Sequence, residues 1–209
     1  MRTGGQPASC WEHDATGSRP VRSLSGCDVA VILVTGIQAA GKSTVAQALA
    51  QRLDRSVHVR GDLFRRMVVN GRVEMGSANP PPEAVRQLRL RHQLAAAAAD
   101  GYADAGFTVV LQDIIIGSHL TEMVSALRSR PLYVVVLAPR ADVVQRREDD
   151  RQAARGKTAY KPGDQSVTEL DALFRAQTPR IGMWIDTSDQ TVEQTVDEVL
   201  ARVWTEGAV

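Results

Sequence analysis

The feature that most constrains this chain is residues 36–44, Gly-Ile-Gln-Ala-Ala-Gly-Lys-Ser-Thr, which fit the pattern G-x-x-x-x-G-K-[ST] in full. A continuous apolar run, residues 29–35, comes directly before this segment, and a helical pattern from Ser43 to about Leu53 follows it. A buried strand, a glycine-rich turn and a helix in this order predict a loop that binds phosphate groups. The alternative is a chance match on a glycine-rich turn, which the flanking strand and helix argue against.

Each residue type in this segment suits contact with a polyphosphate. Gly36 and Gly41 permit backbone angles that other residues avoid, so successive amides can turn towards the phosphates. Lys42 is expected to reach the β- and γ-phosphates of ATP, and the Ser43 hydroxyl to coordinate Mg²⁺. The other predicted nucleotide-binding positions are Ile37, Gln38, Ala39, Ala40 and Thr44.

The rest of the chain predicts an α/β fold, a five-stranded parallel sheet flanked by helices. Short Val- and Ile-rich runs alternate with longer stretches of helical period, which is typical of a sheet covered on both faces. The expected strands are residues 29–35, 56–60, 107–112, 132–138 and 181–185. The expected helices are residues 43–53, 63–69, 82–105, 119–128 and 141–153, with a last helix marked by Val192, Val196, Val199, Leu200 and Val203. Residues 70–82, rich in Gly and Pro, predict a loop that could act as a flap.

Composition and charge narrow the choice of partner. A chain of 209 residues accommodates one domain, and its 25 basic residues nearly balance its 24 acidic ones. No long nucleic acid is therefore expected, because its binding depends on an excess of positive charge. We expect residues 1–28, which contain Cys10 and Cys27, to be a flexible leader before a domain at residues 29–209. That leader lacks the apolar run of a signal peptide, so the expected location is cytoplasmic, without a membrane span.

Two carboxylates follow predicted strands, at the sheet edge where ligands of open α/β folds bind. Asp62 follows the second strand and is the candidate base for an acceptor hydroxyl; the alternative is an N-cap for a helix beginning at Leu63. Asp113 follows the third strand, and we expect it to hold Mg²⁺ through water or to bind the acceptor, an ordinary turn residue being the alternative. Arg65 and Arg66 are candidates for holding the acceptor, or else are solvated arginines.

A charged helix at residues 141–153 predicts a lid over the phosphates. Arg147 and Arg151 are four residues apart, so one helix face can present both guanidinium groups to the transferred phosphoryl group. The alternative is a solvated helix held by its own ion pairs, such as Arg146 with Asp150. If the helix acts as a lid, Gly156 offers a hinge for its movement.

Two smaller groups of polar residues complete the list of candidates. Thr187 and Ser188 follow the last predicted strand and could border the adenine, although capping of the last helix is the favoured single role. His92 and His119 have no partners at metal-ligand spacing, so they are expected to be ordinary surface or core residues.

The chain resembles the P-loop kinases grouped around chloramphenicol phosphotransferase, and more distantly zeta-toxin kinases and the 5′-kinase domain of polynucleotide kinase. The resemblance rests on residues 36–44, 59–62, 109–117 and on the arginines at 147 and 151, and it covers most of residues 29–200. It implies that Asp62 is the base, that Arg147 and Arg151 serve the lid, and that Arg65 matches an acceptor-binding residue of polynucleotide kinases. The chain departs from the antibiotic kinase at Ala39, where that family has Ser, and in the flap, so the identity of the substrate does not carry over.

The expected activity is ATP-dependent transfer of a phosphoryl group to a hydroxyl of a small molecule, an antibiotic or a related metabolite, with Mg²⁺ as cofactor. An Asn-Lys-x-Asp motif, which reads guanine, is absent from the sequence. The alternatives are a kinase of nucleotides or of nucleic-acid 5′-hydroxyl ends, and a regulatory module that binds a nucleotide without turnover.

Overall fold

The core of the protein is a parallel five-stranded sheet. The computed structural model describes residues 29–76, 79–155 and 166–209, so the predicted leader and the proposed hinge at Gly156 lie outside the described residues. The strands are β1 (Val31–Thr35), β2 (Ser56–Arg60), β3 (Thr108–Gln112), β4 (Leu132–Leu137) and β5 (Met183–Ile185), in the order β2-β3-β1-β4-β5. Every neighbouring pair is parallel, which confirms the predicted fold class.

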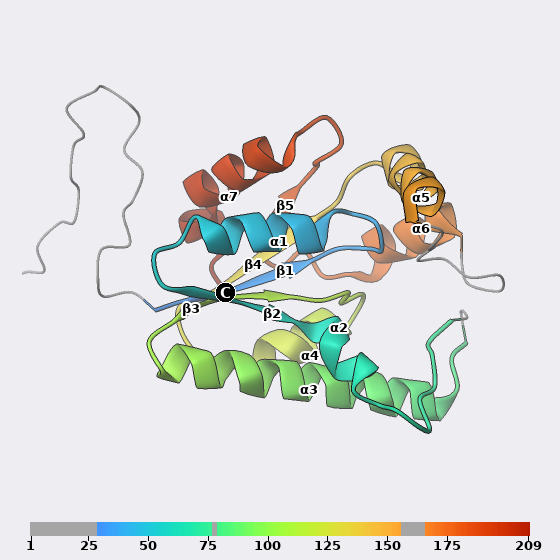
Figure 1. Cartoon of the computed structure of the whole chain (residues 1–209), viewed down its shortest axis with the longest axis horizontal. Helices are drawn as coiled ribbons and strands as arrows, with labels where there is room; N and C mark the ends of the chain where they lie inside the picture. Colours follow the sequence, from blue (N-terminus) through green and yellow to red (C-terminus); the bar gives the residue numbers. More distant parts are fainter. Residues whose placement is uncertain (1–28, 77–78, 156–165) are drawn as a thin grey trace, which may run out of the picture.

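Helices cover both faces of the sheet, which explains why its central strands are mostly apolar. Every residue of β1, β3 and β4 is buried. Helices α1 (Lys42–Gln51) and α7 (Val192–Glu206) lie on one face, and α3 (Pro82–Asp104) and α4 (His119–Ala126) lie on the other (Figure 1). The apolar stripe of α7 packs inward as predicted, with Val196, Val199 and Val203 buried.

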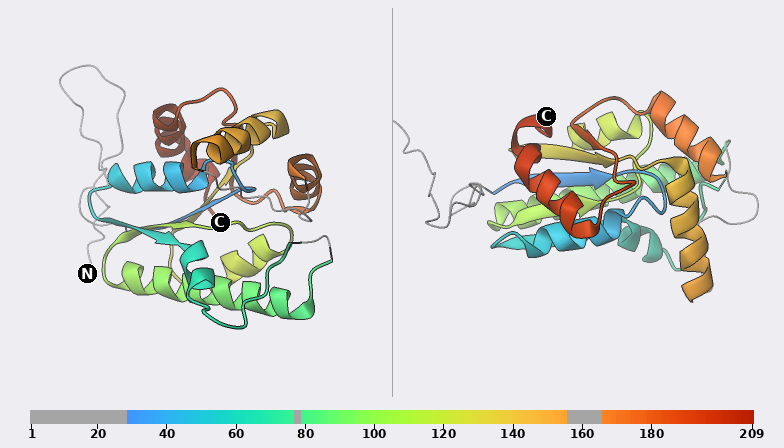
Figure 2. Two further views of the ribbon diagram at one scale, coloured as in Figure 1. Left: turned by 45° about the vertical axis from the view of Figure 1, so that its right-hand side comes forward. Right: turned by 90° about the horizontal axis from the view of Figure 1, so that it is seen from above.

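The remaining helices gather at the carboxyl end of the sheet. These are α2 (Gly61–Arg66), α5 (Ala141–Arg155) and α6 (Val167–Gln177). Figure 2 shows α5 and α6 beyond the ends of the strands, beside the turn that leaves β1. Parallel strands deliver their following loops to one edge, so this end of the molecule collects the candidate site residues.

The helix α6 was not predicted from the sequence. Ser166 and Glu169 form a reciprocal capping box at its start, a pattern of Ser and Glu three residues apart that could have revealed it. On its inner side Phe174 is fully buried and stacks on Trp184, with ring centroids 5.2 Å apart. The helix thereby closes the β5 side of the sheet.

No helix in the described parts of the chain combines the length and the apolar character that crossing a membrane requires.

Candidate functional site

The turn between β1 and α1 has the backbone of a phosphate-binding loop. Gly36 has a φ of 146° and Gly41 a φ of 93°, both closed to most side chains. A Cβ at Gly36 would overlap the carbonyl oxygen of Leu137 at the end of β4, so only glycine fits there. Ala39 is also left-handed, with a φ of 61°, which the sequence did not indicate. Three residues of the loop thus have positive φ angles, a backbone conformation of the kind that anion-binding loops use.

Lys42 lies inside this loop rather than in solvent. It is 6% exposed, and its Nζ donates a 2.6 Å hydrogen bond to the carbonyl oxygen of Ile37. Burial, followed by the nearby charges of Arg91 and Arg151, lowers the pKa of Lys42 to about 7, although the charge of Asp62 acts in the opposite direction. A cation in this position is only partly neutralised by the protein, so a polyphosphate would stabilise its charged form.

Ser43 is linked to the end of β3 through a residue that the sequence did not single out. Its hydroxyl donates a 2.8 Å hydrogen bond to Oε1 of Gln112. A hydroxyl and an amide oxygen side by side are hard oxygen donors, which fits Mg²⁺ held jointly with phosphate oxygens and water. Within the described residues, no cluster of three or more His, Cys, Asp and Glu side chains could hold a metal by itself.

Asp113, which was predicted to bind the metal or the acceptor, forms an ion pair with Arg91. Its carboxylate is fully buried and forms a two-pronged ion pair with Arg91 of α3, with Nε donating to Oδ2 at 2.7 Å. Its Oδ1 also accepts a 2.7 Å hydrogen bond from the amide of Ile114. A Cβ at Gly61 would overlap this carboxylate, so the start of α2 depends on glycine. The observed contacts thus tie Asp113 to Arg91, while Ser43 is bonded to Gln112.

Asp62 lies within the first turn of α2, and the N-cap alternative is wrong. The helix begins at Gly61, two residues earlier than expected, with Arg60 as its N-cap residue and no side-chain cap. Oδ2 of Asp62 pairs with Arg66 at 2.8 Å, whereas Oδ1 is buried and accepts no hydrogen bond from the described residues. Nε of Arg60 lies 3.6 Å from Oδ1. A buried carboxylate oxygen without a donor is suited to take a hydrogen bond from a ligand hydroxyl.

The predicted acceptor arginines belong to a small network on α2 and the loop after it. Arg65 donates to Glu74 across 2.6 Å, and Arg72 shares the same carboxylate oxygen at 3.1 Å. Arg66 is bound to Asp62 instead. Both arginines therefore have a partner that is shared with a second arginine, since Asp62 also lies near Arg60.

Arg147 of α5 reaches across the phosphate loop. Its Nη2 donates to the carbonyl oxygen of Thr187 at 2.8 Å, and its Nη1 lies 3.4 Å from the carbonyl oxygen of Ala40. Burial lowers the pKa of Arg147, which indicates a partly desolvated cation beside the loop. The Thr187 hydroxyl is buried without a hydrogen-bond partner among the described residues, so this corner offers both a cation and a free polar group.

Thr187 and Ser188, in the loop after β5, do not cap the last helix. Thr191 caps α7 in a reciprocal box with Gln194, which corrects the role favoured for Thr187 and Ser188. The Ser188 hydroxyl instead accepts a 2.7 Å hydrogen bond from the amide of Arg140 at the start of α5 and donates to Asp186. The loop after β5 is thereby fastened to the helix that carries Arg147.

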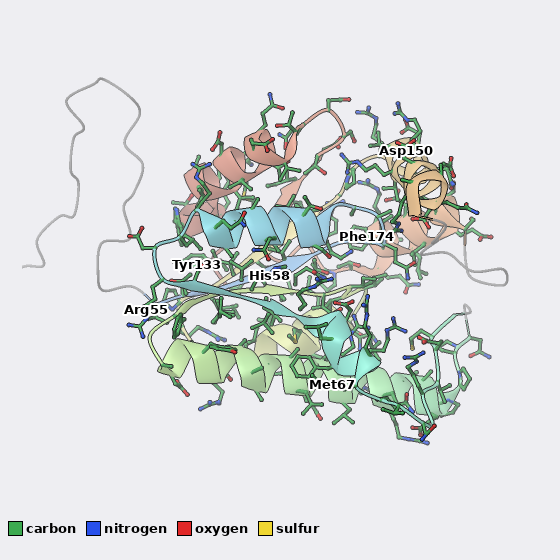
Figure 3. The ribbon with its side chains drawn as sticks, viewed as in Figure 1. Arg55, His58, Met67, Tyr133, Asp150 and Phe174 are labelled. Atoms are coloured by element: carbon green, nitrogen blue, oxygen red, sulfur yellow. The ribbon has the colours of Figure 1, made fainter. Side chains whose placement is uncertain are left out.

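Arg151 also lies on the inner side of α5, where it pairs with the buried Glu148 and lowers the pKa of Lys42. The proposed Arg146–Asp150 pair is wrong: Arg146 binds Asp142 at 2.9 Å, one turn earlier in the helix. Asp150 is exposed on the same helix (Figure 3). Arg147 and Arg151, the arginines predicted to serve a lid, thus make partly buried contacts, whereas Arg146 is solvated.

His92 and His119 lie next to each other, on α3 and at the start of α4. His92 is buried, and burial followed by the charge of Arg91 lowers its pKa to about 4. Its ring meets that of His119 edge-on, with centroids 5.9 Å apart. A neutral, enclosed imidazole is a packing residue here.

Similar structures have been solved for several kinases. A sugar kinase from Janibacter is 18% identical, with a TM-score of 0.58, and the match covers 83% of this chain and 94% of that chain. The APS kinase of Mycobacterium tuberculosis, in complex with AMPPNP and APS, is 16% identical, with a TM-score of 0.59 and coverage of 83% and 96%. The tunicamycin resistance protein of Deinococcus radiodurans is 17% identical, with a TM-score of 0.59 and coverage of 87% and 99%. At such identities these likenesses establish the fold.

The sequence itself matches a family over most of the described domain. No curated protein matches it in a direct comparison. The model of the AAA domain family matches residues 31–176, from the first residue of β1 to near the end of α6, which is more than half of the chain. The chain therefore belongs to the AAA domain family.

Proposed function

We propose that this protein is an ATP-dependent phosphotransferase that transfers the γ-phosphoryl group of ATP to a hydroxyl of a small molecule. The observation that carries the proposal is the buried oxygen of Asp62, which lacks a donor and lies at the same end of the sheet as the phosphate loop. The phosphate loop alone would suit a regulatory module that binds a nucleotide as well as it suits an enzyme. Phosphoryl transfer to an alcohol also needs a group that can accept the proton of the hydroxyl, and a carboxylate at the same end of the sheet as the phosphate loop can do this.

The phosphate loop and α5 would hold the donor. The amides of residues 36–44 would bind the phosphates, with Lys42 exchanging its hydrogen bond to Ile37 for one to a phosphate oxygen. Mg²⁺, when bound, would neutralise phosphate charge, and Ser43 would hold it with Gln112 orienting the hydroxyl. Arg147 would face the nucleotide beside Thr187, and Arg151 would offset charge on the transferred group.

Asp62 would act on the acceptor. Its Oδ1 would accept the proton of the acceptor hydroxyl as the acceptor oxygen bonds to the γ-phosphorus. The bond between that phosphorus and the bridging oxygen of ADP would break in the same step, leaving ADP and a phosphate monoester. Asp113 would contribute indirectly, by orienting Arg91 through their two-pronged ion pair.

The acceptor we propose is an antibiotic or a related small metabolite. The support is the shared fold with a protein described as conferring tunicamycin resistance and with a sugar kinase. A competing acceptor is the 5′-hydroxyl end of a nucleic acid, since a structure of an RNA repair complex also shares the fold, with a TM-score of 0.53.

Two measurements test the proposal. Calorimetry with ATP and Mg²⁺ should show binding that Lys42→Met abolishes, with the exposed Asp54→Asn variant as a control for the substitution procedure. Mass spectrometry should then find a product heavier by one phosphoryl group in a library of antibiotics, sugars and 5′-hydroxyl oligonucleotides. Tight ATP binding with no transfer to any member, and no loss of function on replacing Asp62, would instead indicate a regulatory module.

A further inference from the structure

Most of the large apolar side chains that the described residues expose lie on α2, just after it, or on α3. They are Leu63, Met67, Val69, Leu90, Leu94 and Tyr102, and Val209 is the one found elsewhere in the described parts of the chain. Figure 1 shows α3 along the outside of the molecule, with the sheet on its inner side, and Figure 3 shows Met67 beside this helix. Apolar residues that gather in one exposed region indicate a contact surface, whereas scattered ones do not.

The outer face of α3 carries a stripe without charge. Its members are exposed and follow one another at intervals of four, three and four residues, which places them on one face of the helix; they are Leu90, Leu94, Ala97 and Gly101. Leu90 is 51% exposed and Leu94 is 44% exposed. These four residues, the outer stripe of α3, are suited to pack against another helix.

Gly101 supports a close approach by a second molecule. Glycine inside a helix is less stable than alanine, and the backbone at Gly101 is helical without a positive φ. A Cβ added there would meet no atom of the described residues within 4 Å. The described fold therefore gives no reason for glycine at this position, whereas the close approach of a neighbouring helix does.

The outer stripe is complementary to itself when a second copy of α3 runs antiparallel to the first. The two leucines lie nearer the start of the stripe and the two small residues nearer its end. A twofold axis between Leu94 and Ala97 therefore sets Leu94 against Ala97, and Leu90 against Gly101, so that a large side chain always meets a small one. A parallel pair would set leucine against leucine at one end and leave a gap at Gly101 at the other.

The charges beside the outer stripe favour the same arrangement. Arg86 and Asp104 are 18 residues apart, about five helical turns, so they lie at the same edge of the stripe. In an antiparallel pair the same edges of the two helices meet, so Arg86 of one copy comes near Asp104 of the other, once at each end. Both side chains are 69% exposed, and their contacts with Glu83 and Arg128 are surface ion pairs, which are weak.

We propose that α3 is the centre of an interface between two copies of this chain, which pack antiparallel through the outer stripe with Arg86 of each copy near Asp104 of the other. Leu63 of α2 and the following Met67 would widen the apolar contact beside the helix pair. This inference is independent of the proposed kinase function, because the residues of the outer stripe are not part of the candidate site.

Sedimentation velocity of the full chain over a concentration series tests the proposal and should show an equilibrium between monomer and dimer. Ala97→Lys, which places a charge at the centre of the outer stripe, should weaken the dimer by about tenfold or more. Ala201→Lys is the matched control, because it makes the same change at an exposed position of α7 on the other face of the sheet. This control should leave the dimer unchanged.

An exchange of charges tests the direction of the pairing. Arg86→Glu and Asp104→Arg should each weaken the dimer by about 3- to 30-fold, because each change sets like charges against each other twice. Combining the two changes should restore most of the affinity. Gly101→Ala should weaken the dimer by about fivefold or more, through the added methyl group in the contact, while the single chain in dilute solution becomes more stable.

Two results would overturn the inference. One is a chain that stays monomeric up to about 1 mM, which would leave the outer stripe to a different partner or to none. The other is a dimer that Ala97→Lys and Ala201→Lys affect equally, which would place the contact elsewhere on the molecule. A dimer that the double charge exchange fails to restore would overturn the antiparallel arrangement.

Discussion

The hydroxyl of Ser43 donates a hydrogen bond to the side-chain oxygen of Gln112, and this 2.8 Å contact joins the first turn of α1 to the last residue of β3. The two residues are 69 positions apart, so the contact depends on the pairing of β3 with β1. It fixes the oxygen that is best placed to bind a metal beside the phosphate loop. Gln112 therefore connects the sheet to the hydroxyl that we propose to bind Mg²⁺.

Replacing Gln112 with Ala should weaken the response to Mg²⁺. Loss of an outer partner of a metal ligand typically lowers metal affinity by about 10- to 100-fold, because the ligand is no longer held in one orientation. We expect the Mg²⁺ concentration for half-maximal ATP binding to rise accordingly, with metal-free ADP binding little changed. Gln51→Ala, at the exposed end of α1, is the matched control. Equal Mg²⁺ dependence in both variants would argue against this role.

Replacing Asp62 with Asn should slow transfer while leaving the nucleotide site intact. The amide retains the shape of the side chain but cannot take up the acceptor proton, so we expect turnover to fall by about 10²- to 10⁴-fold. Affinity for ATP and Mg²⁺, measured by calorimetry, should stay within a few-fold of the unmodified value. Full transfer activity in this variant would show that another group, or the phosphate itself, accepts the proton.

The state of Lys42 should depend on pH and on the nucleotide. Its pKa is about 7 in the ligand-free protein, so the ammonium loses its proton as the pH rises through neutrality. Bound phosphates favour the charged form, so ATP binding at about pH 8 should take up about one proton, and the uptake should fall towards zero at about pH 6. Calorimetry in buffers of different ionisation enthalpy measures this number. Lys42→Met should abolish the uptake, and its persistence in that variant would assign it elsewhere.

Much of the fold, and the nucleotide half of the site, could be predicted from the sequence. The phosphate loop carries its own constraint, because Gly36 and Gly41 occupy backbone angles that few residues adopt and Lys42 follows at a fixed spacing. The central strands could be recognised because burial on both faces makes them mostly apolar. Local patterns of this kind can be recognised in a sequence without knowledge of the tertiary structure.

The acceptor half of the site depends on contacts that the sequence does not display. Asp113 is a strand-end carboxylate in the sequence, and only the packing of α3 against β3 brings Arg91 to it from 22 positions away. Nothing local distinguishes Arg91 from Arg86 or Arg89, which lie on the same helix and are exposed or paired differently. The partner of Asp113 could therefore be found only in three dimensions.

Replacing Gly61 with Ala should destabilise the protein through the Asp113–Arg91 pair. The added methyl group would overlap the buried carboxylate of Asp113 and displace it from Arg91, with an expected cost of about 3 kcal/mol in the free energy of unfolding. Gly101→Ala is the matched control, since it adds the same methyl group to an exposed position of α3 with no atom within 4 Å. That change should stabilise the protein by up to about 1 kcal/mol, because alanine is the better helix former. Chemical denaturation of both variants gives the two values, and equal values would show that the overlap is relieved without disturbing the pair.

Replacing Arg147 with Ala should lower the affinity for ATP, because this guanidinium group bridges the phosphate loop and the loop after β5. It donates to Thr187 at 2.8 Å and lies beside Gly41, so its removal takes away both a cation and the link between the two loops. Loss of a charge-assisted hydrogen bond in a partly buried site predicts a fall in affinity of about 10- to 100-fold. Arg146→Ala is a close control, because its side chain is the next one along α5 but is solvated and bound to Asp142. Calorimetric titration of both variants with ATP and Mg²⁺ distinguishes the two faces of the helix, and equal affinities would remove α5 from the nucleotide site.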